Sequence, residues 1–202
     1  GDRIRMNHIY PEGHRVYMRS LATRGSGNSL SPATAGTLDL LRSAGFDLIL
    51  LETSGIGQGD CGVTGFSDLS LYVMTAEFGA PSQLEKINML ELADLVAINK
   101  YEKSGSEDAL REIRTHRARL RGGKPEARPA VFGTRANRFN DPGVNLLFLG
   151  LVERLESLRP GSFRLEEPAR RLLPTADTPC VSIITRKREN YLGEIADTVR
   201  HY

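Results

Sequence analysis

The residues best suited to chemistry in this 202-residue chain follow its short apolar segments. Directly after "LVAI" come Asn99, Lys100, Tyr101 and Glu102. A carboxylate such as that of Glu102 can accept from both the ring N–H and the exocyclic amine of guanine, a charge-assisted pair that adenine cannot supply. Asn99 would hold the loop and contact the base edge, and the stem of Lys100 would cover the face of the base. The stretch therefore predicts a guanine site, with an ordinary polar strand-to-helix turn as the alternative.

A second candidate stretch, "ETSGIGQ" (residues 52–58), follows the apolar segment "LILL". An acid such as Glu52 beside a phosphate site can hold magnesium, usually through water, and the Thr53 hydroxyl can join it. Gly55 would let its backbone N–H approach a phosphate, and Gln58 is a candidate for orienting a water molecule. The alternative is a solvated glutamate before a tight turn.

The first residues, "GDRIRM", supply a further candidate pair. Asp2 would be a magnesium ligand and Arg5 a clamp on phosphoryl oxygens, although simple solvated charges would give the same pattern. The phosphate-binding sequence G-x-x-x-x-G-K-[ST] does not occur in the chain. Because of this, and because the chain begins at Gly1, we interpret it as a fragment of a longer protein that would lack its main phosphate anchor on its own.

The elements that must position these residues alternate along the chain. Apolar runs predict strands at 46–51, 69–75, 94–100 and 129–134. Helical patterns occupy 31–45 (with Ser31 as N-cap and Gly45 beyond the end), 81–93, 106–121 and 142–158. This alternation predicts an α/β fold with a mostly parallel sheet flanked by helices. Because ligands bind beyond the carboxyl ends of parallel strands, the candidate stretches are expected at one edge of the sheet.

The chain's ordinary composition argues against several partners. Hydrophobic residues make up 40%, charged residues 26%, and the net charge is +2, which indicates no nucleic-acid or membrane partner. Cys61 and Cys180 lack metal-ligand spacing, which favours a reduced, cytoplasmic setting. The arginines of the helix at 106–121 predict a solvated face on which Glu107 pairs with Arg111; they are Arg111, Arg114, Arg117, Arg119 and Arg121.

The motifs "GDRIRM", "ETSGIGQGD", "ELADLVAINKYE" and "FGTRANRFNDPG", taken in order, resemble the GTPases of the MeaB/ArgK family. That family assists adenosylcobalamin-dependent acyl-CoA mutases, and the likeness is strongest to the GTPase segment of fused isobutyryl-CoA mutases. The resemblance implies a phosphate-loop GTPase-like fold that is truncated at its N-terminus. It also implies a partial GTPase domain over residues 1–160, and a linker and helix over residues 161–202 leading toward a mutase domain.

The resemblance also implies roles for single residues. Asp2, Glu52 and Thr53 would surround magnesium, and Arg5 would contact the nucleotide and act in catalysis. From the residues themselves, Gln58 is a further catalytic candidate and Gly55 a further candidate for contact with the nucleotide. The guanine-reading residues would be Asn99, Lys100, Tyr101 and Glu102, where Glu102 replaces the aspartate that is usual in the Asn-Lys-x-Asp element of GTP-binding proteins.

The function implied in this way is that of a magnesium-dependent GTPase segment that couples GTP hydrolysis to cofactor loading or protection of the mutase. Its cofactors would be GTP and Mg²⁺, while adenosylcobalamin would be bound elsewhere in the parent enzyme or by its partner. The mutase domain and a second copy of the chain, as a homodimer, would be its partners. A non-catalytic docking or dimerisation module and a free-standing mutase-associated GTPase are the alternatives.

Overall fold

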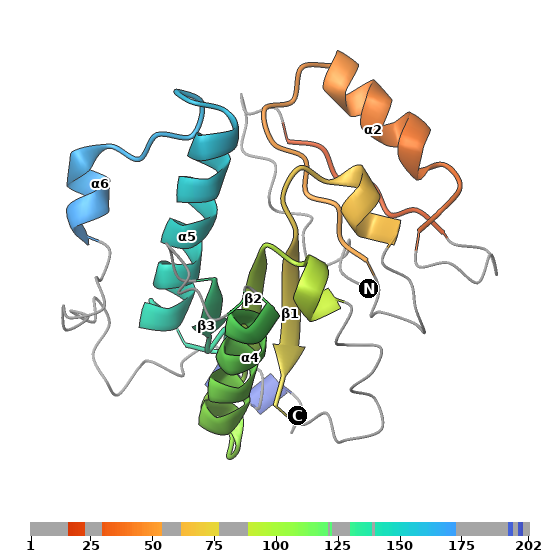
Figure 1. The fold of residues 1–202 in the computed structure, drawn as a ribbon. Helices are drawn as coiled ribbons and strands as arrows, with labels where there is room; N and C mark the ends of the chain where they lie inside the picture. Colours follow the sequence, from red (N-terminus) through yellow and green to blue (C-terminus); the bar gives the residue numbers. More distant parts are fainter. Residues whose placement is uncertain are drawn as a thin grey trace. The chain divides into compact units, whose positions relative to one another are not determined.

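The chain divides into two compact units, Gly1–Ser67 and Asp68–Tyr202, and each is described here by itself. The computed structural model describes residues 16–22, 30–53, 62–76, 89–120, 122, 130–138, 140–172, 194–195 and 198–199 (Figure 1).

A parallel sheet forms the centre of the second unit (Figure 1). Within the described residues its strands lie in the order β1-β2-β3, and they are Leu71–Thr75 (β1), Leu95–Asn99 (β2) and Val131–Gly133 (β3). All three confirm strands predicted from the sequence. The middle strand β2 is buried from Leu95 to Ile98, as expected for an apolar run with both faces covered. In β1 the side chain of Tyr72 is buried, and this burial raises the pKa of its hydroxyl above the ordinary value.

Two helices pack on this sheet and confirm the predicted α/β fold (Figure 1). α4 spans Ser106–Leu120 and contacts β2 and β3, and α5 spans Pro142–Leu158 and contacts β3. Leucines on α5 cover a buried cluster of Leu95, Ala130 and Phe132. A Cβ atom at Gly150 of α5 would lie 2.9 Å from the ring of Phe132, so glycine permits this close approach.

In the first unit, the predicted helix is confirmed as α2, Thr34–Ser43, followed by the short 3₁₀ helix η1, Gly62–Phe66. Gly45 follows α2 with a φ of 71°, as its predicted place beyond the helix end requires. The prediction of Ser31 as N-cap is wrong, because the capping position is Ala33. The Ser31 hydroxyl instead accepts a hydrogen bond from the Ala33 N–H at 3.3 Å, in the turn that precedes the helix.

The strand predicted at residues 46–51 is absent, and this segment carries no regular secondary structure. Leu50 is 82% exposed there. A strand is stabilised by backbone hydrogen bonds to a neighbour, and no described segment pairs with residues 46–51. The apolar sequence is therefore present without the pairing that would make it a strand.

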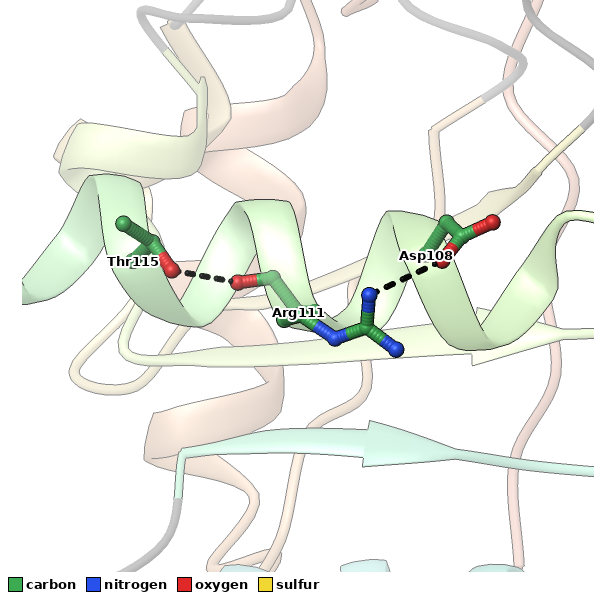
Figure 2. Close-up of polar contacts among 3 residues, drawn as sticks. All are labelled: Asp108, Arg111 and Thr115. Atoms are coloured by element: carbon green, nitrogen blue, oxygen red, sulfur yellow. Dashed lines mark hydrogen bonds and ion pairs between the residues drawn. The ribbon is translucent and has the colours of Figure 1, made fainter.

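The solvent-facing side of α4 carries local polar contacts (Figure 2). Arg111 donates to the Asp108 carboxylate at 3.1 Å, and the Thr115 hydroxyl donates to the backbone carbonyl of Arg111 at 2.8 Å. Glu107, the partner expected from sequence spacing, is replaced in this role by Asp108, one residue closer. Because the side chains of Arg111 and Asp108 are more than two-thirds exposed, the pair adds little to stability.

Arg117 does not belong to that solvated face, and its prediction as an exposed residue is wrong. Its side chain is buried, and one guanidinium nitrogen donates to the carbonyls of Leu90 at 3.0 Å and Ala93 at 2.7 Å. A buried guanidinium requires such acceptors, because an unpaired one would be strongly destabilising. Arg117 thereby ties α4 to the segment that enters β2.

The remaining described segments are short. Residues 89–92 are helical, in agreement with the end of the helix predicted at 81–93, whose earlier part lies outside the described residues. Beyond Pro160 a short helix, α6, spans Glu167–Leu172, and Arg170 donates to Glu153 of α5 at 3.2 Å. The boundary at residue 160 stays a prediction. None of the helices within the described ranges is long and apolar enough to cross a membrane.

Candidate functional site

A sharp turn at the end of β2 presents the residues predicted to read guanine. Lys100 has a φ of 55°, which is uncommon for a residue other than glycine. Its carbonyl accepts from the Lys103 N–H at 2.9 Å and from the Ser106 hydroxyl at 3.4 Å, at the start of α4. Such unusual backbone conformations persist where the surroundings impose them, and they concentrate at functional sites.

The loop that follows β3 is bound directly to this turn. The side-chain oxygen of Asn99 accepts from the backbone N–H of Ala136 at 3.2 Å and from the Thr134 hydroxyl at 3.4 Å. The Tyr101 N–H also donates to the Thr134 carbonyl, at 3.1 Å. Asn99 therefore holds the loop, as predicted from the sequence, and its side-chain NH₂ group is the one suited to donate to a base edge.

Asp141 fixes the same loop from its other end. It is buried at the N-cap of α5, and one carboxylate oxygen accepts from the Val144 N–H at 3.0 Å and from the Arg135 N–H at 3.1 Å. Sequence reasoning did not single out Asp141. The signal was present, however, because an aspartate before proline at the first helical position is a typical N-cap.

Glycine allows the start of α5 to approach the end of β3 closely. A Cβ atom at Gly143 would collide with the backbone carbonyl of Gly133. The site is therefore built from backbone segments packed against each other, and the side chains of Asp141 and Asn99 accept hydrogen bonds that join them.

The two loops line an open pocket of about 340 Å³, which we name the β2–β3 pocket. Its volume lies within the usual range of small-molecule sites. It is lined by Asn99, Lys100, Glu102, Lys103, Ala136 and Asn137. These residues bring together a carboxylate, two ammonium groups and two amides. This combination suits a planar base that offers both donors and acceptors.

Tyr101, also predicted to contact the nucleotide, is not among the residues that line the β2–β3 pocket. Its ring lies against Gly133, where a Cβ atom would come within 2.5 Å of it. The guanidinium of Arg135 lies 5.9 Å from the ring centroid, within the range of a cation–π contact. In this structure, Tyr101 packs the two loops together.

The other predicted site residues are Glu52, Thr53 and four residues that lie outside the described part of the chain. Glu52 is exposed and Thr53 is half-buried, and both belong to the unit Gly1–Ser67, whereas the β2–β3 pocket belongs to the unit Asp68–Tyr202. Asp2, Arg5, Gly55 and Gln58 lie outside the described residues. Among the residues that the structure describes, no group of three or more His, Cys, Asp or Glu side chains could hold a metal ion.

Comparison with known protein families identifies the family of this chain. The family model described as methylmalonyl Co-A mutase-associated GTPase MeaB matches residues 1–164. The chain belongs to the MeaB family. The match includes Glu52 and Thr53 and every residue of the β2–β3 pocket, so both parts of the predicted site fall within the MeaB domain.

Curated relatives of this MeaB-family chain include larger proteins. It is 47% identical over 204 residues to the fused isobutyryl-CoA mutase of Geobacillus kaustophilus, covering all of this chain and 18% of that protein. It is 48% identical over 209 residues to the fused isobutyryl-CoA mutase of Paraburkholderia xenovorans, covering 16% of it. A putative GTPase of Pyrococcus horikoshii is 30% identical over 203 residues, 62% of its length. The MeaB-family chain thus spans under a fifth of the fused relatives.

Proposed function

We propose that this chain is the guanine-reading part of a magnesium-dependent GTPase that serves an adenosylcobalamin-dependent acyl-CoA mutase. The observation that carries the proposal is the β2–β3 pocket, where Asn99, Lys100 and Glu102 from one loop face Ala136 and Asn137 from the next. Membership of the MeaB family and the names of the fused relatives support the link to a mutase. The substrate of the parent enzyme is proposed to be isobutyryl-CoA on the same ground.

In this proposal the base of GTP binds in the β2–β3 pocket. The Glu102 carboxylate accepts from the two guanine donors, the Asn99 NH₂ group donates to the base edge, and the stem of Lys100 covers one face. Because the Asn99 side-chain oxygen is engaged by Ala136 and Thr134, the amide group keeps the orientation that this role requires.

Magnesium and the phosphates belong to the other part of the proposal. The Glu52 carboxylate and the Thr53 hydroxyl are hard oxygen donors of the kind that Mg²⁺ takes. As a ligand set they are incomplete by themselves, so Asp2, phosphate oxygens and water are proposed to complete it. The bound ion would neutralise charge on the phosphates. Arg5 and Gln58 keep their proposed catalytic roles, and Gly55 its proposed contact with phosphate.

The assembly and its location complete the proposal. The mutase domain is the proposed partner, and the working unit is a homodimer, which sedimentation of the full-length protein tests. A cytoplasmic setting is proposed because Cys61 and Cys180 show no spacing typical of a disulfide framework.

Replacing Glu102 with glutamine in the full-length protein tests the proposed function. Glutamine offers one acceptor and one donor where the carboxylate offers only acceptors. Its pattern therefore matches xanthine, which has a carbonyl in place of the guanine amine. We expect GTP affinity to fall roughly 10- to 100-fold, from the loss of one charge-assisted hydrogen bond, while affinity for xanthosine triphosphate rises.

A matched control is Glu107→Gln, which changes an exposed glutamate on the first turn of α4, outside the β2–β3 pocket. It should leave the affinities for GTP, ATP and xanthosine triphosphate unchanged. Equal affinity of the unmodified protein for GTP and ATP, or unchanged base preference in Glu102→Gln, would remove the role given to Glu102.

A further inference from the structure

A hydrogen bond across the β2–β3 pocket connects its two loops at the carboxylate of Glu102. The side-chain nitrogen of Asn137 donates to Oε1 of Glu102 at 3.2 Å. The two residues are 35 positions apart in the chain and both line the pocket. We propose that Asn137 is a positioning residue for base selection, which holds the Glu102 carboxylate where it can accept both guanine donors. This inference rests on the proposed function, since it assigns the reason for guanine preference to a second residue.

Glu102 needs such a partner because its side chain is long and exposed. A glutamate has one more rotatable bond than an aspartate, so its carboxylate can occupy more positions, and fixing it costs more conformational entropy. A hydrogen bond that forms before the nucleotide arrives restricts these positions in advance. The contribution of Asn137 is therefore to organise the carboxylate of Glu102.

The contact leaves the carboxylate able to bind a base. An ionised carboxylate has about four acceptor positions on its two oxygens. Donation from Asn137 uses one of them, and the base requires two more. The Asn137 amide is also uncharged, so it orients Glu102 without neutralising it as a lysine or arginine at the same position would.

Asn137 can act in this way because hydrogen bonds hold the backbone of the residues on either side of it in the chain. The neighbouring Ala136 N–H donates to Asn99 at 3.2 Å, and the Arg135 N–H donates to the buried Asp141 at 3.1 Å. The Arg138 N–H donates back to the Arg135 carbonyl at 3.0 Å, which closes the turn around Asn137. The amide therefore projects from a fixed backbone position.

A double-mutant cycle in the full-length protein tests the inference, with GTP and inosine triphosphate as ligands. Inosine lacks the exocyclic amine, so it offers Glu102 one donor in place of two. We expect Asn137→Ala to weaken GTP binding roughly three- to tenfold. The affinity for inosine triphosphate should fall less than the affinity for GTP. In the Glu102→Ala background, Asn137→Ala should have no further effect on either ligand.

Asn145→Ala serves as the matched control, because the Asn145 amide donates to the Asn140 side chain at 2.6 Å, outside the lining of the β2–β3 pocket. It should leave the preference for GTP over inosine triphosphate unchanged. If Asn137→Ala lowered GTP affinity as much in the Glu102→Ala background as in the unmodified protein, the inference would be overturned and the proposed function would stay intact. If Glu102→Ala itself left GTP binding unchanged, the proposed function would fail, and the role of Asn137 with it.

Discussion

The carboxylate of Asp141 is predicted to be the main support of the loop that forms one wall of the β2–β3 pocket. Asp141 is 4% exposed, and one of its oxygens accepts from the Arg135 and Val144 N–H groups. Alanine at this position removes an N-cap, which costs about 1 kcal/mol. It also removes a hydrogen bond to a charged acceptor, which costs about 1.5–3 kcal/mol. The sum for Asp141→Ala is therefore about 2.5–4 kcal/mol of local stability.

Hydrogen–deuterium exchange of peptides that cover residues 130–145 measures this loss in the full-length protein. A loss of about 2.5–4 kcal/mol corresponds to roughly 60- to 700-fold faster exchange at the Arg135 and Val144 amides, where local opening governs exchange. Asp141→Asn keeps an oxygen acceptor without the charge, so its effect should be smaller. GTP affinity should also fall more in Asp141→Ala than in Asp141→Asn, because the loosened loop carries Ala136 and Asn137.

The control for this experiment is Asp108→Ala, which removes a carboxylate that pairs with Arg111 on the exposed face of α4 (Figure 2). Exposed pairs of this kind contribute about 0–1 kcal/mol, so exchange at residues 130–145 should not change. Unaltered protection of the Arg135 and Val144 amides in Asp141→Ala would refute the reasoning, because it would show that Asp141 does not hold the loop.

Two further predictions concern stability and turnover. Arg117→Met removes the donors to the Leu90 and Ala93 carbonyls and should lower the free energy of unfolding by about 2–4 kcal/mol. Arg111→Met should change it by no more than about 0.5 kcal/mol. Thermal unfolding measures both variants, and an equal loss of stability in the two would contradict the assignment of Arg117 as a buried residue. Glu52→Ala in the full-length protein should lower magnesium-dependent phosphate release from GTP about 100-fold, with little change in GTP affinity. The 202-residue chain alone should release no phosphate. Rapid hydrolysis of GTP by that chain would mean that the phosphate site has been misassigned.

Much of the second unit could be predicted from the sequence, because its signals are local. The apolar run of β2 and the periodic patterns of α4 and α5 each have the length and period that their structure requires. The segment 46–51 had the same kind of apolar signal as β2, yet it forms no strand. The difference lies in pairing, which apolar periodicity does not encode, because a strand depends on hydrogen bonds to a distant neighbour.

In the candidate site, too, some features follow from the sequence and others only from the packing of separate elements. The sequence by itself determined which residues are available: Asn99 to Glu102, directly after an apolar run and within the residues that match the MeaB family model. Only the tertiary structure decided which polar groups meet, such as Asn137 with Glu102 and Asp141 with the Arg135 N–H. It also decided that Arg117 is buried while Arg111 stays exposed on the same helix. The physical reason is that residue type and spacing set a side chain's chemistry and helix face, whereas its partners are set by how separate elements pack.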